Sequence, residues 1–156
     1  MPNMDRYIRT ETIFSTIGST VVNILFFFLV FGTKGPIEVW GAGQYAFDFV
    51  PQSFMTALLC TWLPGVITRK RLASGAVNHL LGPRPRPASL ILRGLLYGVV
   101  ALGLGAGAVA AGLYLLGLHE VNWLGGFVFK LAFGAIVAAI VTPLGLRALL
   151  REASAN

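Results

Sequence analysis

Residues 90–118 read LILRGLLYGVVALGLGAGAVAAGLYLLGL, and Arg93 is the only charged residue among them. An α-helix rises about 1.5 Å per residue, so roughly 20 apolar residues cross the hydrocarbon core of a bilayer. Three further apolar stretches reach this length, at about 12–31, 44–67 and 123–146. The sequence therefore predicts an all-α, polytopic integral membrane protein. Its four transmembrane helices should form an antiparallel bundle, a single membrane domain over residues 1–156.

The composition also favours a membrane environment. Hydrophobic residues make up 56% of the chain and charged residues 12%, which is about half the charged share of a soluble domain. The net charge is +6, but the basic residues lie between the apolar stretches and not on a polar face of the kind that binds nucleic acid. We expect the lipid bilayer as a partner, and no nucleic acid.

Basic residues are distributed unevenly between the two sides of the predicted bundle. Ten lie on the side that carries both termini and the segment between the second and third spans, whereas the other side has only Lys34. Because basic residues in short loops stay in the cytoplasm, we expect both termini there and the protein in the cytoplasmic (inner) membrane. Trp40 and Trp123 would then lie at the outer boundary. The ten basic residues are Arg6, Arg9, Arg69, Lys70, Arg71, Arg84, Arg86, Arg93, Arg147 and Arg151.

The longest connection is a basic cytoplasmic loop predicted over 68–89. Its first part, 68–81, could form a short helix on the inner membrane surface. Alternating prolines then make 83–87 a stiff extended segment, either a spacer or a proline-rich motif that binds a partner. We expect the basic side chains of this connection to contact anionic lipid headgroups: Arg69, Lys70, Arg71, Arg84 and Arg86.

Apart from Arg93, which is counted with the basic side above, two charged residues, Asp48 and Lys130, fall inside predicted spans. Asp48 lies 16 residues before Pro64, and Lys130 lies 13 residues before Pro143. Their depths should thus differ by only about 4–5 Å. Since an unpaired charge in low dielectric is strongly unfavourable, we hypothesise an ion pair between the second and fourth spans. The alternatives are a lysine that reaches the headgroups beside a hydrated aspartate, or a site for a proton or ion.

Polar side chains follow one face of the first two spans. Asp48, Gln52 and Thr56 recur every four residues, so they share a helix face. A stripe of hydroxyl residues in the first span ends at Asn23 near mid-depth, and lipid tails cannot satisfy its amide. If the two stripes face each other, a polar line crosses the membrane. It would serve either as interhelical hydrogen bonding or as a path for protons or a small solute.

The third span is rich in glycine. Gly94 and Gly98 form one GxxxG pair, and Gly103 and Gly107 form another. Small residues let helix backbones approach closely. We therefore expect these glycines to form a tight packing face, either inside the bundle or in a homodimer.

The second and fourth spans end alike. Each has a proline in its last turns, followed by glycine and then by arginine, in the segments WLPGVITR (62–69) and VTPLGLR (141–147). The chain could consist of two similar helical hairpins, or the two ends could have converged on a common helix-end pattern.

No motif of an enzyme active site or a nucleotide-binding loop occurs in the chain. His79 and His119 fall on opposite sides of the predicted membrane, and the single cysteine, Cys60, lies within a span. We expect no metal and no cofactor. Two functions remain. One is a non-enzymatic accessory or structural subunit that interacts with other membrane proteins, as a homo-oligomer or in a larger complex. The other is a small oligomeric transporter or proton-coupled permease that uses Asp48 and Lys130.

Overall fold

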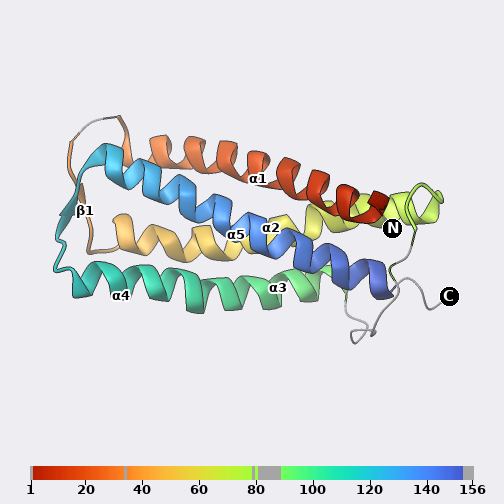
Figure 1. The fold of residues 1–156 in the computed structure, drawn as a ribbon. Helices are drawn as coiled ribbons and strands as arrows, with labels where there is room; N and C mark the ends of the chain where they lie inside the picture. The colour runs from red at the N-terminus through yellow and green to blue at the C-terminus, as the bar shows by residue number, and fades with distance from the viewer. Residues whose placement is uncertain (1, 34, 79, 81–88, 153–156) are drawn as a thin grey trace.

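The computed structural model describes residues 2–33, 35–78, 80 and 89–152 (Figure 1). Among these residues, four continuous helical rods are long and apolar enough to cross a membrane. The predicted all-α fold with four membrane-length helices is therefore confirmed. The elements are α1 (Pro2–Phe31), β1 (Ile37–Glu38), α2 (Tyr45–Ala73), α3 (Leu90–Val100), the π-helical η1 (Ala101–Ala106), α4 (Gly107–Leu115), β2 (Glu120–Val121) and α5 (Trp123–Glu152).

The rods lie side by side along one long axis, and α1 begins at the same end of the bundle at which α5 ends (Figure 1). We call this the terminus end and the opposite one, which carries β1 and β2, the strand end. The segments α3, η1 and α4 follow each other without a break and form one rod. Helix α2 packs against both this rod and α5, whereas α1 packs mainly on α5. The suggested repeat of two hairpins stays a prediction.

The outside of the bundle is apolar. Large aliphatic side chains point outward on several helices, including Leu29 (81% exposed), Leu104 (73%) and Leu115 (82%). A water-soluble domain does not expose contiguous apolar surface on this scale, whereas hydrocarbon solvates it well. Four apolar rods with outward aliphatic side chains are what a membrane-embedded protein requires.

A short antiparallel sheet closes the strand end. Ile37 pairs with Val121 and Glu38 with Glu120. Two tryptophans reinforce the closure, because Trp40 Nε1 donates to Leu118 O at 2.9 Å and Trp123 Nε1 donates to Gly32 O at 3.1 Å. The two connections at this end are thus joined to each other, which fixes where α2 and α5 begin.

At the terminus end the structure differs from the predicted loop 68–89 and its surface helix. Helix α2 continues through Ala73, so Arg69 lies on a membrane-length helix. Arginine, lysine, leucine and alanine all favour helix, which explains the extension. The helix ends just before Gly75, whose φ of 72° suits glycine. Arg84 and Arg86 lie outside the described residues.

The glycines of the third span divide between two faces. A Cβ on Gly94 would lie 2.8 Å from Leu58 Cδ1, and one on Gly98 would lie 2.8 Å from Phe54 Cδ2, so both glycines permit close contact with α2. A Cβ on Gly103 or Gly107 would meet nothing within 4 Å. The second pair follows the first by nine residues, which is about half a turn out of phase on a helix. Only the first pair therefore packs inside the bundle.

We expect Gly98→Val to lower the free energy of unfolding by about 1–3 kcal/mol, because the new methyl groups must displace Phe54. The matched variant Gly107→Val should stay within about 0.5 kcal/mol of wild type. Denaturant-induced unfolding in detergent micelles, followed by circular dichroism, measures both. Equal destabilisation by the two variants would contradict the assignment of faces.

Candidate intramembrane polar site

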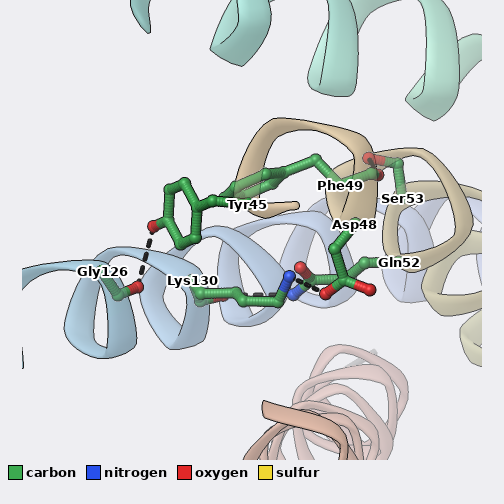
Figure 2. A network of polar contacts seen from close by, with 7 residues as sticks. All are labelled: Tyr45, Asp48, Phe49, Gln52, Ser53, Gly126 and Lys130. Atoms are coloured by element: carbon green, nitrogen blue, oxygen red, sulfur yellow. Dashed lines mark hydrogen bonds and ion pairs between the residues drawn. The ribbon is translucent and has the colours of Figure 1, made fainter. Parts of the chain in front are cut away.

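Two opposite charges meet in the strand-end half of the bundle. Lys130 Nζ donates a hydrogen bond to Asp48 Oδ2 and forms an ion pair with it (Figure 2). The Lys130 side chain is 2% exposed and the Asp48 side chain 20% exposed. Asp48 lies in the first turn of α2, and Lys130 comes from α5. The structure thus joins the two charges of the sequence hypothesis and links the two helices through them.

Aromatic rings enclose the Lys130 ammonium. Its Nζ lies 4.7 Å from the ring centroid of Phe49, 5.3 Å from that of Phe31 and 5.7 Å from that of Tyr45. Phe31 ends α1, whereas the other two rings belong to α2. A cation is attracted to the electron-rich face of an aromatic ring, and more strongly when water is excluded. The ammonium therefore sits among three helices, with rings in place of solvent.

Tyr45 ties the same two helices together one turn before Asp48. Its hydroxyl donates to Gly126 O on α5 at 2.8 Å (Figure 2), and the residue is 1% exposed. A Cβ on Gly126 would lie 3.2 Å from Tyr45 Cε2. The glycine leaves space for the ring to approach the α5 backbone.

Gln52 continues the polar face of α2. Its Nε2 donates to Lys130 O at 3.2 Å, so α2 binds both the ammonium and the backbone of Lys130. The Gln52 residue is 9% exposed. Its Oε1 has no hydrogen-bond partner among the described residues, which leaves one acceptor available beside the ion pair.

Asn23 brings α1 to the same place. It is 7% exposed, and its amide lies directly over Gly134 of α5, where a Cβ would collide with Nδ2. The same Cβ would lie 3.1 Å from Gln52 Nε2. Gly134 is therefore the point at which the polar side chains of α1 and α2 converge on α5.

Polar contacts continue from Asn23 toward the terminus end. Asn23 Nδ2 donates to Ser19 Oγ at 3.4 Å, and Thr142 Oγ1 donates to Ser15 Oγ at 3.0 Å. Together these contacts form a line between three helices. We call it the polar seam, which consists of Ser15, Ser19, Asn23, Asp48, Gln52, Lys130 and Thr142.

A second set of polar contacts holds α1 to α2 near the terminus end. The hydroxyls of Tyr7 and Thr68 share a hydrogen bond of 2.8 Å. Arg71 Nη1 pairs with Glu11 Oε1 at 2.6 Å, and the Arg71 guanidinium lies 5.4 Å from the centroid of the Tyr7 ring. Arg71, predicted to contact lipid headgroups, is thus engaged within the protein.

The first span's predicted polar stripe is only partly used across helices. Thr12 and Thr20 donate back to backbone oxygens of their own helix, at 2.7 and 2.8 Å. Thr56 is buried at 8% exposure on the same α2 face as Asp48. Helix α5 takes part throughout, so the seam is a junction of three helices and not a line between the first two.

Sequence reasoning missed three parts of the site: the rings around Lys130, the glycines of α5, and the pair of Glu11 with Arg71. One signal was readable, because Gly126 and Gly134 lie four residues before and after Lys130 and so share its helix face. Glu11 also continues the four-residue spacing of Ser15 and Ser19.

The chemistry available in the seam is ion pairing and hydrogen bonding between helices. Within the described parts of the chain, no three histidine, cysteine, aspartate or glutamate side chains gather to hold a metal. The expected lack of a metal or cofactor remains a prediction. No protein family, curated protein or solved structure matches this chain.

Reversing either charge of the central pair should impair folding. Asp48→Lys would place two ammonium groups together, and Lys130→Asp two carboxylates, each lowering the free energy of unfolding by about 3–5 kcal/mol. The double swap should recover most of that loss. Arg147→Asp, a reversal at an exposed position of α5, is the matched control. Unfolding in micelles measures all four, and single swaps as stable as the control would refute the pairing.

Gly134→Ala tests the three-helix junction. Its methyl group would collide with the Asn23 amide, and we expect a loss of about 1–3 kcal/mol in unfolding free energy. Gly125→Ala, on the same helix with open space around it, should be neutral or stabilising. Combining Gly134→Ala with Asn23→Ala should recover part of the loss. If the losses in unfolding free energy of Gly134→Ala and Asn23→Ala simply add in the double variant, the Asn23 side chain does not contact α5 at this glycine.

Proposed function

We propose that this chain is a non-enzymatic accessory subunit that packs against other membrane proteins. The observation that carries the proposal is the sealing of Lys130, whose side chain is 2% exposed and paired with Asp48. A transport site must exchange its ion or proton with water, whereas a structural pair works best without it. The buried ammonium and its pairing with Asp48 therefore support a role in holding helices together.

The surface offered to a partner is the outer face of the rod formed by α3, η1 and α4. Val99, Gly103, Gly107 and Ala111 follow each other at four-residue intervals and are all exposed. Space for a Cβ is open at both glycines. Small residues on an exposed transmembrane face allow a neighbouring helix to approach closely. The neighbour would be another membrane protein or a second copy of this chain.

The charge distribution supports the proposed orientation, with both termini in the cytoplasm and the protein in the inner membrane. Arg6, Arg9 and Arg147 are exposed near the terminus end. Trp40 is 39% exposed at the strand end, as expected of a tryptophan at a membrane boundary. These features agree with the positive-inside rule.

A small oligomeric transporter or proton-coupled permease is the second candidate. Two observations favour it: the Asp48 side chain retains 20% exposure, and Gln52 Oε1 has no partner among the described residues. Together they leave a polar acceptor and a partly accessible carboxylate in one place. A second copy of the chain would have to complete the path.

The accessory role predicts a stable assembly in native membranes. After mild detergent extraction, the wild-type chain should migrate as a species well above its mass of 16.7 kDa. Gly107→Leu should lose most of that species, because the larger side chain keeps the neighbouring helix away. Gly18→Leu, at another glycine with open space, should retain it. Migration of the wild type as a monomer would contradict the proposal.

Proteoliposomes distinguish the two candidates. A pH-sensitive dye inside the vesicles reports how fast an imposed pH gradient decays. If the chain is an accessory subunit, the gradient should decay as slowly as it does in protein-free vesicles. A proton-coupled carrier would accelerate the decay in the wild type and lose the acceleration in Asp48→Asn. The latter pattern would replace the accessory role by transport.

A further inference from the structure

A cavity of about 350 Å³ opens where the last turns of α2 meet the first turn of α3. It lies near the terminus end, away from the polar seam. Its lining residues are Trp62, Val66, Arg69, Lys70, Ser89, Leu90 and Ile91. The two cationic side chains and the apolar ones make it amphipathic.

Close packing of α3 on α2 forms one wall of this cavity. A Cβ on Gly65 would lie 2.8 Å from Leu90 Cδ2, so the Leu90 side chain packs directly against the α2 backbone. On α2, Trp62, Val66 and Arg69 follow at intervals of four and three residues and therefore share a helix face. The arginine and its neighbour Lys70 thus stand at one end of the cavity and the tryptophan at the other.

The cations of the cavity are available for a ligand. Arg69 and Lys70 are both exposed, and no hydrogen bond or ion pair engages either side chain within the described parts of the chain. Arg71, by contrast, is paired with Glu11 at 2.6 Å. Two adjacent cations attract an anion.

Backbone donors add to this attraction. Ser89 is the N-cap of α3, and its Oγ accepts from Leu92 N at 3.1 Å. The N–H groups of Leu90 and Ile91 have no acceptor within the helix, because the first turn lacks one. Such N–H groups bind phosphate well when cationic side chains accompany them.

The apolar part of the cavity indicates where the anion comes from. Trp62 is 39% exposed and Ile91 is 57% exposed, and both continue the apolar outer surface. These side chains open the cavity toward the apolar outer surface, where the molecules that reach it are lipids. A phospholipid would cover them with its acyl chains while its phosphate meets the cations. Tryptophan is also common at this boundary between headgroups and hydrocarbon.

We propose that this cavity is a binding site for a phospholipid with a net negative headgroup. The phosphate lies between Arg69, Lys70 and the first N–H groups of α3, and an acyl chain lies against Trp62. The proposal is independent of the accessory role, because it concerns a different surface and needs no protein partner.

Quenching of Trp62 fluorescence by brominated lipids tests the site. The protein is placed in vesicles of phosphatidylcholine with a minority of phosphatidylglycerol. In one sample the phosphatidylglycerol carries bromine on its acyl chains, and in the other an equal amount of phosphatidylcholine does. Subtracting the signal of Trp62→Phe isolates this tryptophan. We expect the brominated anionic lipid to quench Trp62 several-fold more than the zwitterionic one does.

Charge variants show whether the preference is local. In Arg69→Gln/Lys70→Gln the preference for the anionic lipid should disappear, because each cation near the membrane surface contributes about fivefold to the binding of an anionic lipid. Arg6→Gln/Arg9→Gln removes the same charge at the same end, on α1, and should leave the preference intact. An equal fall in both double variants would mean diffuse attraction to the membrane and would overturn the site.

A second pair of variants keeps the test valid should the double variant fold poorly. Aspartate and asparagine are both good N-cap residues, so Ser89→Asp and Ser89→Asn should each preserve α3. The added carboxylate should abolish the preference, whereas the neutral amide should retain it. Identical quenching in the two variants would refute the site. Loss of the preference on adding inorganic phosphate would show that a soluble anion fills it instead.

Discussion

Hydrocarbon offers no hydrogen-bond donor or acceptor, so each polar group inside a transmembrane bundle must find its partner within the protein. Lys130 is the residue on which this constraint acts most strongly, because its ammonium is almost fully buried. Asp48 neutralises it, and aromatic rings from two helices surround it. The pair joins α2 to α5, and the hydrogen bonds from Tyr45 to Gly126 O and from Gln52 to Lys130 O reinforce the same junction.

Glycines of α5 allow polar side chains of the neighbouring helices to contact its backbone closely. Gly126 faces Tyr45, Gly134 faces Asn23 and Gln52, and Gly145 lies where a Cβ would be 3.2 Å from Thr61 Cγ2. Each glycine leaves space for the facing side chain to approach the α5 backbone closely. The glycines of α3 do the same for the apolar side chains of α2. Helix α2 thus packs closely on α5 mainly through polar side chains and on α3 through apolar side chains.

Much of this arrangement could be predicted from the amino-acid pattern. The length of the apolar stretches predicted four spans, and the positions of Asp48 and Lys130 relative to Pro64 and Pro143 predicted their similar depth. Depth follows from counting residues, because the rise of a helix is constant. Which helices are neighbours does not follow from it. That α5 lies against both α1 and α2 depends on the summed packing of all four helices, and a single sequence does not reveal it.

Other features of the structure were not predicted correctly from the sequence, and the reasons are local. The sheet joining Ile37 to Val121 involves only two residues from each strand, too few to leave an alternating pattern. The sequence could have shown that Gly103 and Gly107 lie on the face opposite to Gly94 and Gly98. The two pairs are nine residues apart, which is about two and a half turns of a helix. The extension of α2 to Ala73 shows that the basic residues from Arg69 to Arg71 do not mark the end of the helix.

Water-edited solid-state NMR of the ¹⁵N-labelled lysines in bilayers tests most directly whether the buried pair is dry. The chain has three lysines, Lys34, Lys70 and Lys130, and Lys130→Met assigns the signal of interest. Magnetisation from water should reach Lys70 Nζ quickly and Lys130 Nζ hardly at all, and Lys130 Nζ should show dipolar coupling to the Asp48 carboxylate. Transfer from water to Lys130 as fast as to Lys70 would contradict a sealed structural pair.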